Sequence, residues 1–183
     1  MLHRLSQWLR RRVRGWHALA GLVVLLVFGA TVLPVQASRV LGDSPDTAFL
    51  YSAGDLTRMA EAYGEAGRAG YIRSRWTFDL AFPMVYGFFL VTSTAWLLGR
   101  AFSEDSPWQL ANLMPLAAVA FDLLENTLAT VVMRAYPAEA PLAAVLAPLA
   151  SALKWIFVSG SFVLLAVAAV LALLRQVRAG RPN

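Results

Sequence analysis

A chain of 183 residues that is 58% hydrophobic and only 15% charged is too apolar for an ordinary soluble domain, which is about half apolar and a quarter charged. A membrane protein is therefore the first interpretation. The net charge of +5 does not indicate nucleic-acid binding, because the arginines flank the apolar runs instead of forming one stripe. The lack of cysteine excludes disulfides, thiolate nucleophiles and cysteine-bound metals.

Residues 1–17 form a basic arm that is predicted to lie in the cytoplasm and to anchor the chain at lipid headgroups. The apolar run 18–35 is about long enough to span a bilayer. It also has features of a secretory signal peptide, because residues 35–37 (Val-Gln-Ala) offer small side chains at suitable cleavage positions. We favour an uncleaved first span, and both alternatives place the next segment outside.

Residues 37–74 are the longest polar stretch and form the predicted extracytoplasmic loop. Residues 42–46 are expected to form a turn. Asp55 is placed to cap a helix, and the apolar residues after it recur at i, i+3, i+4 and i+7. This pattern predicts a short amphipathic helix that is broken up by glycines before Tyr71, and that serves as a lid or as a plain connector. The pattern consists of Leu56, Met59, Ala60 and Tyr63, and the glycines are Gly64, Gly67 and Gly70.

The second span, 76–98, and the third, 109–133, both carry acidic side chains. In the second, Asp79 lies near the outer boundary, and Pro83 and Tyr86 follow it on the same helical face. In the third, one face of an otherwise apolar helix carries three polar side chains near mid-depth. These are Asp122, Glu125 and Asn126.

The fourth span, 142–174, would measure about 50 Å as one helix, more than a bilayer core of about 30 Å needs. Pro148 is therefore expected to break or to start it. Lys154 is predicted to lie between the outer boundary and the middle, with Ser151 and Ser161 on its face. The basic tail 176–183 follows. The chain thus reads as an all-α, four-helix transmembrane bundle over residues 18–175.

Four ionisable side chains fall inside the predicted spans. If each faced lipid alone, they would together cost roughly 10–14 kcal/mol, comparable to the whole stability of a small domain. They are therefore predicted to share one wet pocket that opens outward between the second, third and fourth spans. At least one of the carboxyls is predicted to be protonated unless Arg73, Arg75 or Arg134 supplies a further positive charge. The four are Asp79, Asp122, Glu125 and Lys154.

Such a group of side chains suits several kinds of chemistry. Neighbouring carboxyls with unequal protonation are what general acid–base catalysis and proton relays both need. Carboxylates with an amide also suit Mg²⁺ or Ca²⁺, but the nearby lysine would compete with a cation, and we predict no metal and no other cofactor. A buried network that only fixes helix register is a further alternative.

Several of these motifs resemble a family of small four-span bacterial membrane proteins. The resemblance covers residues 60–160, its most specific part is the intramembrane Asp-x-x-Glu-Asn of residues 122–126, and it implies the four-span layout but no activity. Four-helix sterol-isomerase-like proteins of the emopamil-binding group are similar at the level of the fold and also place acids in a cavity open outward or to lipid. The matching positions are Gly67, Arg68, Tyr71, Asp79, Pro83, Tyr86, Asp122, Glu125, Asn126, Tyr136, Pro137 and Lys154.

The leading functional hypothesis is a pocket that binds a lipid-like or amphiphilic small molecule, with Asp122 and Glu125 as a possible acid–base pair. The alternatives are a proton- or ion-coupled carrier or channel component, and a scaffold with a buried polar network. The predicted ligand-binding residues are Asp79, Tyr86, Asn126, Lys154, Ser151, Arg68 and Tyr71.

The expected location is the bacterial inner (plasma) membrane. Nine arginines fall on the predicted cytoplasmic side and six on the other, which puts both termini inside. Membrane lipids are expected partners and nucleic acid is not. The sequence does not indicate whether the chain forms a homo-oligomer.

Overall fold

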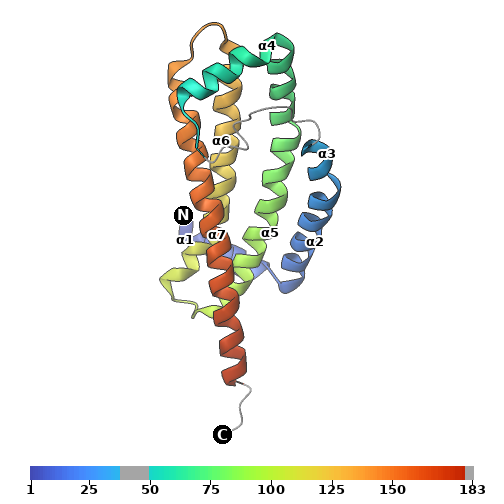
Figure 1. Cartoon of the computed structure of the whole chain (residues 1–183). Helices are drawn as coiled ribbons and strands as arrows, with labels where there is room; N and C mark the ends of the chain where they lie inside the picture. The colour runs from blue at the N-terminus through green and yellow to red at the C-terminus, as the bar shows by residue number, and fades with distance from the viewer. Residues whose placement is uncertain (38–49, 180–183) are drawn as a thin grey trace. The chain divides into compact units, whose positions relative to one another are not determined.

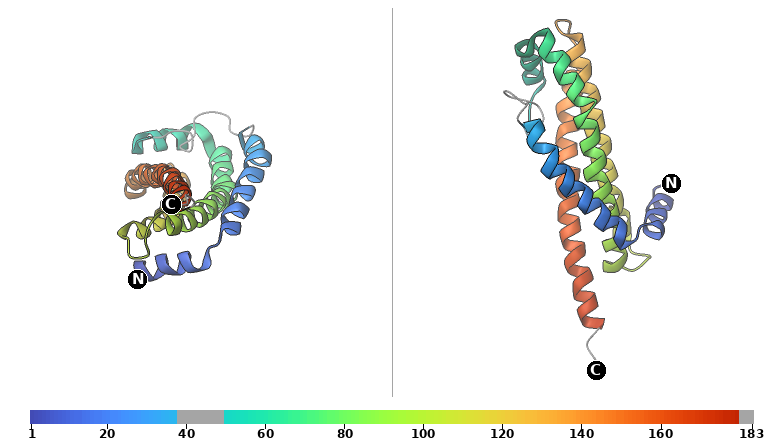
Figure 2. Two further views of the ribbon diagram at one scale, coloured as in Figure 1. Left: turned by 90° about the horizontal axis from the view of Figure 1, so that it is seen from below. Right: turned by 90° about the vertical axis from the view of Figure 1, so that its right-hand side faces the viewer.

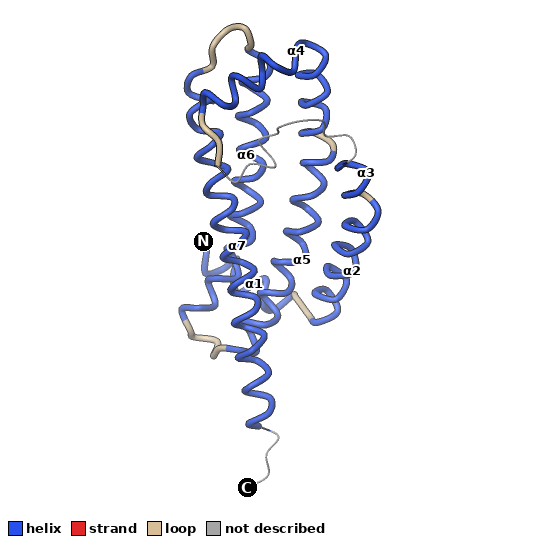
Figure 3. The backbone as a smooth tube through the Cα atoms, viewed as in Figure 1, coloured by secondary structure: helices blue, strands red, loops and turns tan. Residues whose placement is uncertain are grey.

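The computed structural model describes residues 1–37 and 50–179, and within these ranges it contains helices and no strand (Figures 1 and 3). The predicted turn at 42–46 lies outside the described residues. The elements are α1 (Leu2–Arg12), α2 (Gly15–Thr31), α3 (Leu33–Ala37), α4 (Ala53–Arg75), α5 (Phe78–Ala101), the 3₁₀ helix η1 (Pro107–Leu113), α6 (Met114–Ala135) and α7 (Pro141–Ala179).

Four helical stretches are long and apolar enough to cross a membrane, which confirms the all-α four-helix membrane fold. Because many of their large apolar side chains are exposed, these helices need a lipid environment. The stretches are Gly15–Val35, Ala53–Ala101, Pro107–Ala135 and Pro141–Ala179.

By its internal contacts the chain divides into two compact units. Unit 1 contains residues Met1–Val27, Val85–Ala117 and Phe157–Asn183. Unit 2 contains residues Phe28–Met84 and Ala118–Ile156.

In unit 1 the basic arm is a folded helix rather than a loose extension. The Ser6 hydroxyl of α1 donates a buried hydrogen bond of 2.9 Å to the Gln109 carbonyl of η1. The Asn112 amide donates one of 3.2 Å back to the Ser6 carbonyl. These two bonds fix α1 against η1.

A glycine lets α2 lie close to α5 within unit 1 (Figure 2). A Cβ atom at Gly21 would lie only 2.8 Å from the Cα atom of Phe89. Small residues of this kind allow the close backbone approach on which helix packing in membranes depends.

In unit 2, α4 begins with a capping box and bends at one glycine. Ser52 accepts a hydrogen bond from the Asp55 amide, and the Asp55 carboxylate accepts one from the Ser52 amide. Gly64 adopts φ 63° and ψ −178°, a conformation open almost only to glycine, and the helix then resumes. The predicted amphipathic helix is therefore present but longer than expected, because Gly67 and Gly70 remain helical.

The expectation that Pro148 breaks or starts the last span is wrong, because α7 is continuous from Pro141 to Ala179. A proline removes only one backbone hydrogen bond, and a long helix tolerates that loss at the cost of a bend.

The core of unit 2 is built from small and apolar side chains of α4, α6, α7 and the segment just before α4. Alanines dominate the contribution of α7, so its backbone can approach its neighbours closely. The buried members are Tyr51, Leu56, Ala60, Ala129, Val132, Met133, Ala143, Ala144 and Ala147.

Candidate functional site

The buried face of α6 carries the acidic motif. Its residues recur at the helical spacing i, i+3, i+4, i+7, i+8 and i+11, so the polar side chains and the apolar core lie on one stripe. The amphipathic pattern of α6 thus turns its acids toward protein instead of lipid. The stripe consists of Asp122, Glu125, Asn126, Ala129, Thr130 and Met133.

Glu125 is completely buried and is held by two groups from other segments. Its Oε2 lies 2.5 Å from the Lys154 ammonium of α7, and its Oε1 accepts a 3.1 Å hydrogen bond from the Tyr51 hydroxyl. Burial and the Glu125 carboxylate raise the pKa of Tyr51 far above its usual value, so the phenol stays protonated and remains a donor.

Asp122 shares the same cation at a longer distance. Its Oδ1 lies 4.0 Å from the Lys154 ammonium, and its side chain is almost fully buried. One turn of α6 therefore presents two carboxyls to a single lysine at unequal distances.

Arg75, at the end of α4, connects the acidic motif to the start of α5. Its guanidinium donates a 2.7 Å hydrogen bond to the Asn126 amide oxygen and a further bond to the Tyr71 hydroxyl. Its Nε lies 3.8 Å from the Asp79 carboxylate. The side-chain amide nitrogen of Asn126 in turn donates a 2.8 Å bond to the Asp79 backbone carbonyl. The oxygen and the nitrogen of this amide therefore each have a hydrogen-bond partner.

These contacts form two clusters in unit 2, one around Lys154 and one around Arg75. The two clusters adjoin on α6, and together their eight side chains make up what we call the polar network. It contains three carboxyls and two cations, so one excess negative charge remains if all five groups are ionised. The buried Arg75 supplies one of the three additional cations considered from the sequence. The polar network consists of Tyr51, Tyr71, Arg75, Asp79, Asp122, Glu125, Asn126 and Lys154.

Six of the nine predicted site residues lie in this network: Asp79, Asp122, Glu125, Asn126, Lys154 and Tyr71. Ser151 is buried on α7, one turn before Lys154 on the same face. Arg68 lies elsewhere in unit 2. It donates a 3.0 Å bond to the Ala60 carbonyl and stacks over Tyr136, which stabilises the bend of α4 at Gly64. Tyr86 is buried in unit 1.

Tyr51 is the member of the network that the sequence did not predict. It lies 74 positions from Glu125 in the chain and just before α4, in a polar segment with no periodic signal. Arg75 was considered only as one of three arginines. Its i, i+4 spacing to Asp79 was the available signal for choosing it.

Within residues 1–37 and 50–179, no group of three or more His, Asp or Glu side chains is placed to hold a metal ion. In the polar network, lysine and arginine occupy the positions next to the carboxylates.

The helices and the polar network define a multi-pass α-helical membrane protein with a buried charged network in one of its two units. Comparison with protein-family models, with curated proteins and with solved structures finds no match to this chain.

Proposed function

We propose that this membrane protein binds a lipid-like or amphiphilic small molecule at the polar network, and that Asp122 and Glu125 act on it as an acid–base pair. The observation that carries this proposal is the environment of Glu125. A fully buried carboxylate is held by Lys154 at 2.5 Å and by the Tyr51 hydroxyl at 3.1 Å, with Asp122 at 4.0 Å from the same ammonium.

The number of buried charges supports a working site over a device for helix register. A single buried polar residue or ion pair suffices to set register, and each additional ionised group adds a desolvation cost of several kcal/mol. Five ionisable side chains lie in the two clusters of the polar network. Groups that oppose stability in this way are typical of functional sites in membranes.

The two carboxyls suit complementary roles. Glu125 forms the shorter ion pair with Lys154 and accepts a hydrogen bond from Tyr51, so it is the candidate base. Asp122 lies farther from the shared cation and is the candidate acid. Lys154 and Arg75 would bind an anionic head and balance charge.

The surroundings favour a ligand with an apolar body. On α6 and α7, the residues next to the network that face away from it are exposed and apolar, among them Leu124, Leu149 and Ile156. A molecule dissolved in the bilayer would meet this surface before reaching the polar side chains. We place the network in the outer half of the membrane, in a pocket that opens outward.

The competing function is a buried network that only stabilises the bundle. The pairing of Glu125 with Lys154 and of Asp79 with Arg75 favours it, because paired charges need no ligand. The two functions predict different results when Glu125 and Lys154 are both replaced.

Glu125→Gln, Lys154→Met and the double variant separate these functions. Each single variant breaks the buried pair of Glu125 and Lys154 and should lower the free energy of unfolding by about 3–5 kcal/mol. The double variant should regain most of that stability. The wild type is expected to co-purify with an amphiphile, and the double variant should still lose it. Lipid mass spectrometry of the purified protein and denaturant unfolding in micelles give the two readouts.

Glu61→Gln, which removes an exposed acid on α4, is the matched control and should change neither readout. Two results would contradict the proposal. One is a wild type with no amphiphile enriched over bulk lipid, and the other is a double variant that keeps the wild-type complement.

The proposed location is the bacterial inner membrane with both termini in the cytoplasm, because more arginines flank that side. Reporter fusions at Asn183 and at Ala138, in the turn between α6 and α7, test this orientation. The fusion at 183 should be active only with a reporter that works in the cytoplasm, and the fusion at 138 only with one that works outside. The reverse pattern would invert the topology and move the network to the inner half.

A further inference from the structure

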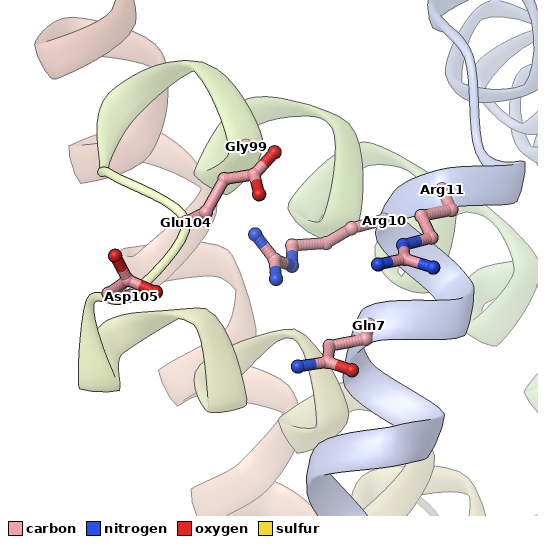
Figure 4. A pocket seen from close by; sticks show the side chains of 6 residues that line it. All are labelled: Gln7, Arg10, Arg11, Gly99, Glu104 and Asp105. Carbon is pink, nitrogen blue, oxygen red and sulfur yellow. The ribbon is translucent and has the colours of Figure 1, made fainter.

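Unit 1 contains a notch between α1 and the end of α5 whose walls carry opposite charges (Figure 4). The cavity volume is about 300 Å³, the lower end of the range for small-molecule sites. We call it the α1 notch, and it is lined by Gln7, Arg10, Arg11, Gly99, Glu104 and Asp105.

The charges of the α1 notch do not neutralise one another by direct pairing. Figure 4 shows Arg10 reaching from α1 into the space, with the carboxylates of Glu104 and Asp105 on its far side. In the described part of the chain, neither Arg10 nor Arg11 makes an ion pair with these acids. The Nε atom of Arg10 is also buried without a hydrogen-bond partner there.

The position of one wall and the charge of the other follow from the helices that form them. The buried bonds between Ser6 and Gln109 and between Asn112 and Ser6 fix α1. The opposite wall includes Gly99 in the last turn of α5, where the helix dipole contributes partial negative charge. The wall formed by α1 therefore favours an anion, and the wall that carries Glu104 and Asp105 favours a cation.

We propose that the α1 notch binds the headgroup of a zwitterionic phospholipid that carries a primary ammonium. The phosphate would accept hydrogen bonds from Arg10, Arg11 and Gln7, since guanidinium groups match phosphate geometry. The ammonium would lie against Glu104 and Asp105. Its three N–H donors can bond both carboxylates, which a quaternary choline nitrogen cannot do.

A lipid fits better than a free phosphate compound because of what surrounds the notch. The helix α1 also carries exposed apolar side chains, Leu2, Leu5 and Trp8, and it directly precedes the first apolar span. An amphipathic helix of this kind lies at the headgroup level with its apolar side toward the acyl chains. Trp108 of η1 is exposed as well and is suited to the same interface.

This inference does not rest on the proposed function of the polar network, because no residue is shared. The test reconstitutes the full chain into vesicles with equal amounts of phosphatidylethanolamine and phosphatidylcholine that carry identical acyl chains. After extraction in mild detergent, mass spectrometry measures the ratio of the two lipids that stay bound.

The wild type should retain the ethanolamine lipid about tenfold over the choline lipid, which corresponds to about 1.4 kcal/mol. The double variant Glu104→Gln/Asp105→Asn should lose this preference. Arg10→Gln/Arg11→Gln should lower the retention of both lipids. Gly99→Leu should do the same without changing any charge, since a side chain at Gly99 has open space to fill. Arg4→Gln, on α1 but outside the notch lining, should behave like the wild type.

A separate experiment adds soluble phosphoethanolamine as a competitor. It should not displace the bound lipid, because it lacks acyl chains. Displacement by it would overturn the assignment to a lipid. A wild-type ratio within about twofold of one would overturn the proposal as a whole. So would a ratio that survives the loss of both acids.

Discussion

Arg75 is buried because its planar guanidinium satisfies three neighbours at once. It bonds the Asn126 oxygen at 2.7 Å and the Tyr71 hydroxyl, lies 3.8 Å from Asp79, and has its Cζ atom 4.7 Å from the centre of the Tyr71 ring. A lysine carries a compact charge without this fork or its stacking face.

We therefore predict that Arg75→Lys lowers the free energy of unfolding by about 2–4 kcal/mol, because buried groups of Asn126 and Tyr71 lose partners. Arg73→Lys is the control, since Arg73 is exposed two residues earlier, and it should change stability by less than about 0.5 kcal/mol. Denaturant unfolding in micelles measures both. Equal effects would show that Arg75 contributes charge alone.

Whether a residue of the network could be predicted from the sequence depends on the range of its contacts. The face formed by Asp122, Glu125 and Asn126 follows from helical spacing within one span. The Tyr51 contact joins positions 74 apart, with α4, α5 and η1 between them, and a local sequence pattern carries no information on such a long-range contact. The sequence therefore predicted the acids and the lysine but not the phenol that holds Glu125.

Among the elements, α4 differs most from expectation, and one glycine explains the difference. All three glycines of its second half were expected to break the helix. Only Gly64 adopts a positive φ, whereas Gly67 and Gly70 keep helical geometry. A glycine lowers helix stability modestly and interrupts a helix only where other contacts stabilise a turn. At Gly64 these contacts are made by Arg68, which bonds the Ala60 carbonyl and stacks over Tyr136.

Gly64→Ala should lower stability by about 1–3 kcal/mol, because an L residue is strained at this φ and ψ. The added Cβ would meet nothing within 4 Å, so the loss reflects backbone strain and not a clash. Gly70→Ala, with equally open surroundings in the same helix, should instead raise stability by about 0.5–1 kcal/mol. Thermal unfolding followed by circular dichroism compares the two, and a shift in the same direction for both would contradict the positive φ at Gly64.

At the scale of the whole molecule, exposure has a different meaning than in a soluble protein. In the apolar stretches of the first and last spans only 11% and 17% of the residues are buried, against 44% in the second and third. Composition predicted this membrane class correctly, because a chain this apolar has more apolar side chains than its own interior can bury. The length of the last helix was less predictable, since Pro148 is a strong local signal that the continuous α7 overrides.

Lipid contact can be tested at Val163, which is 64% exposed near the middle of α7. In water an exposed valine tolerates lysine with a change of less than about 0.5 kcal/mol, whereas a lysine at the bilayer centre costs about 2.5–3.5 kcal/mol. Val163→Lys should therefore reduce membrane insertion and stability in lipid nanodiscs sharply. Val177→Lys, which is 50% exposed between Arg175 and Arg178, should be tolerated because a lysine there reaches the headgroups. Membrane-fraction yield and unfolding in nanodiscs measure the difference, and equal tolerance at both positions would mean that this face of α7 does not lie in hydrocarbon.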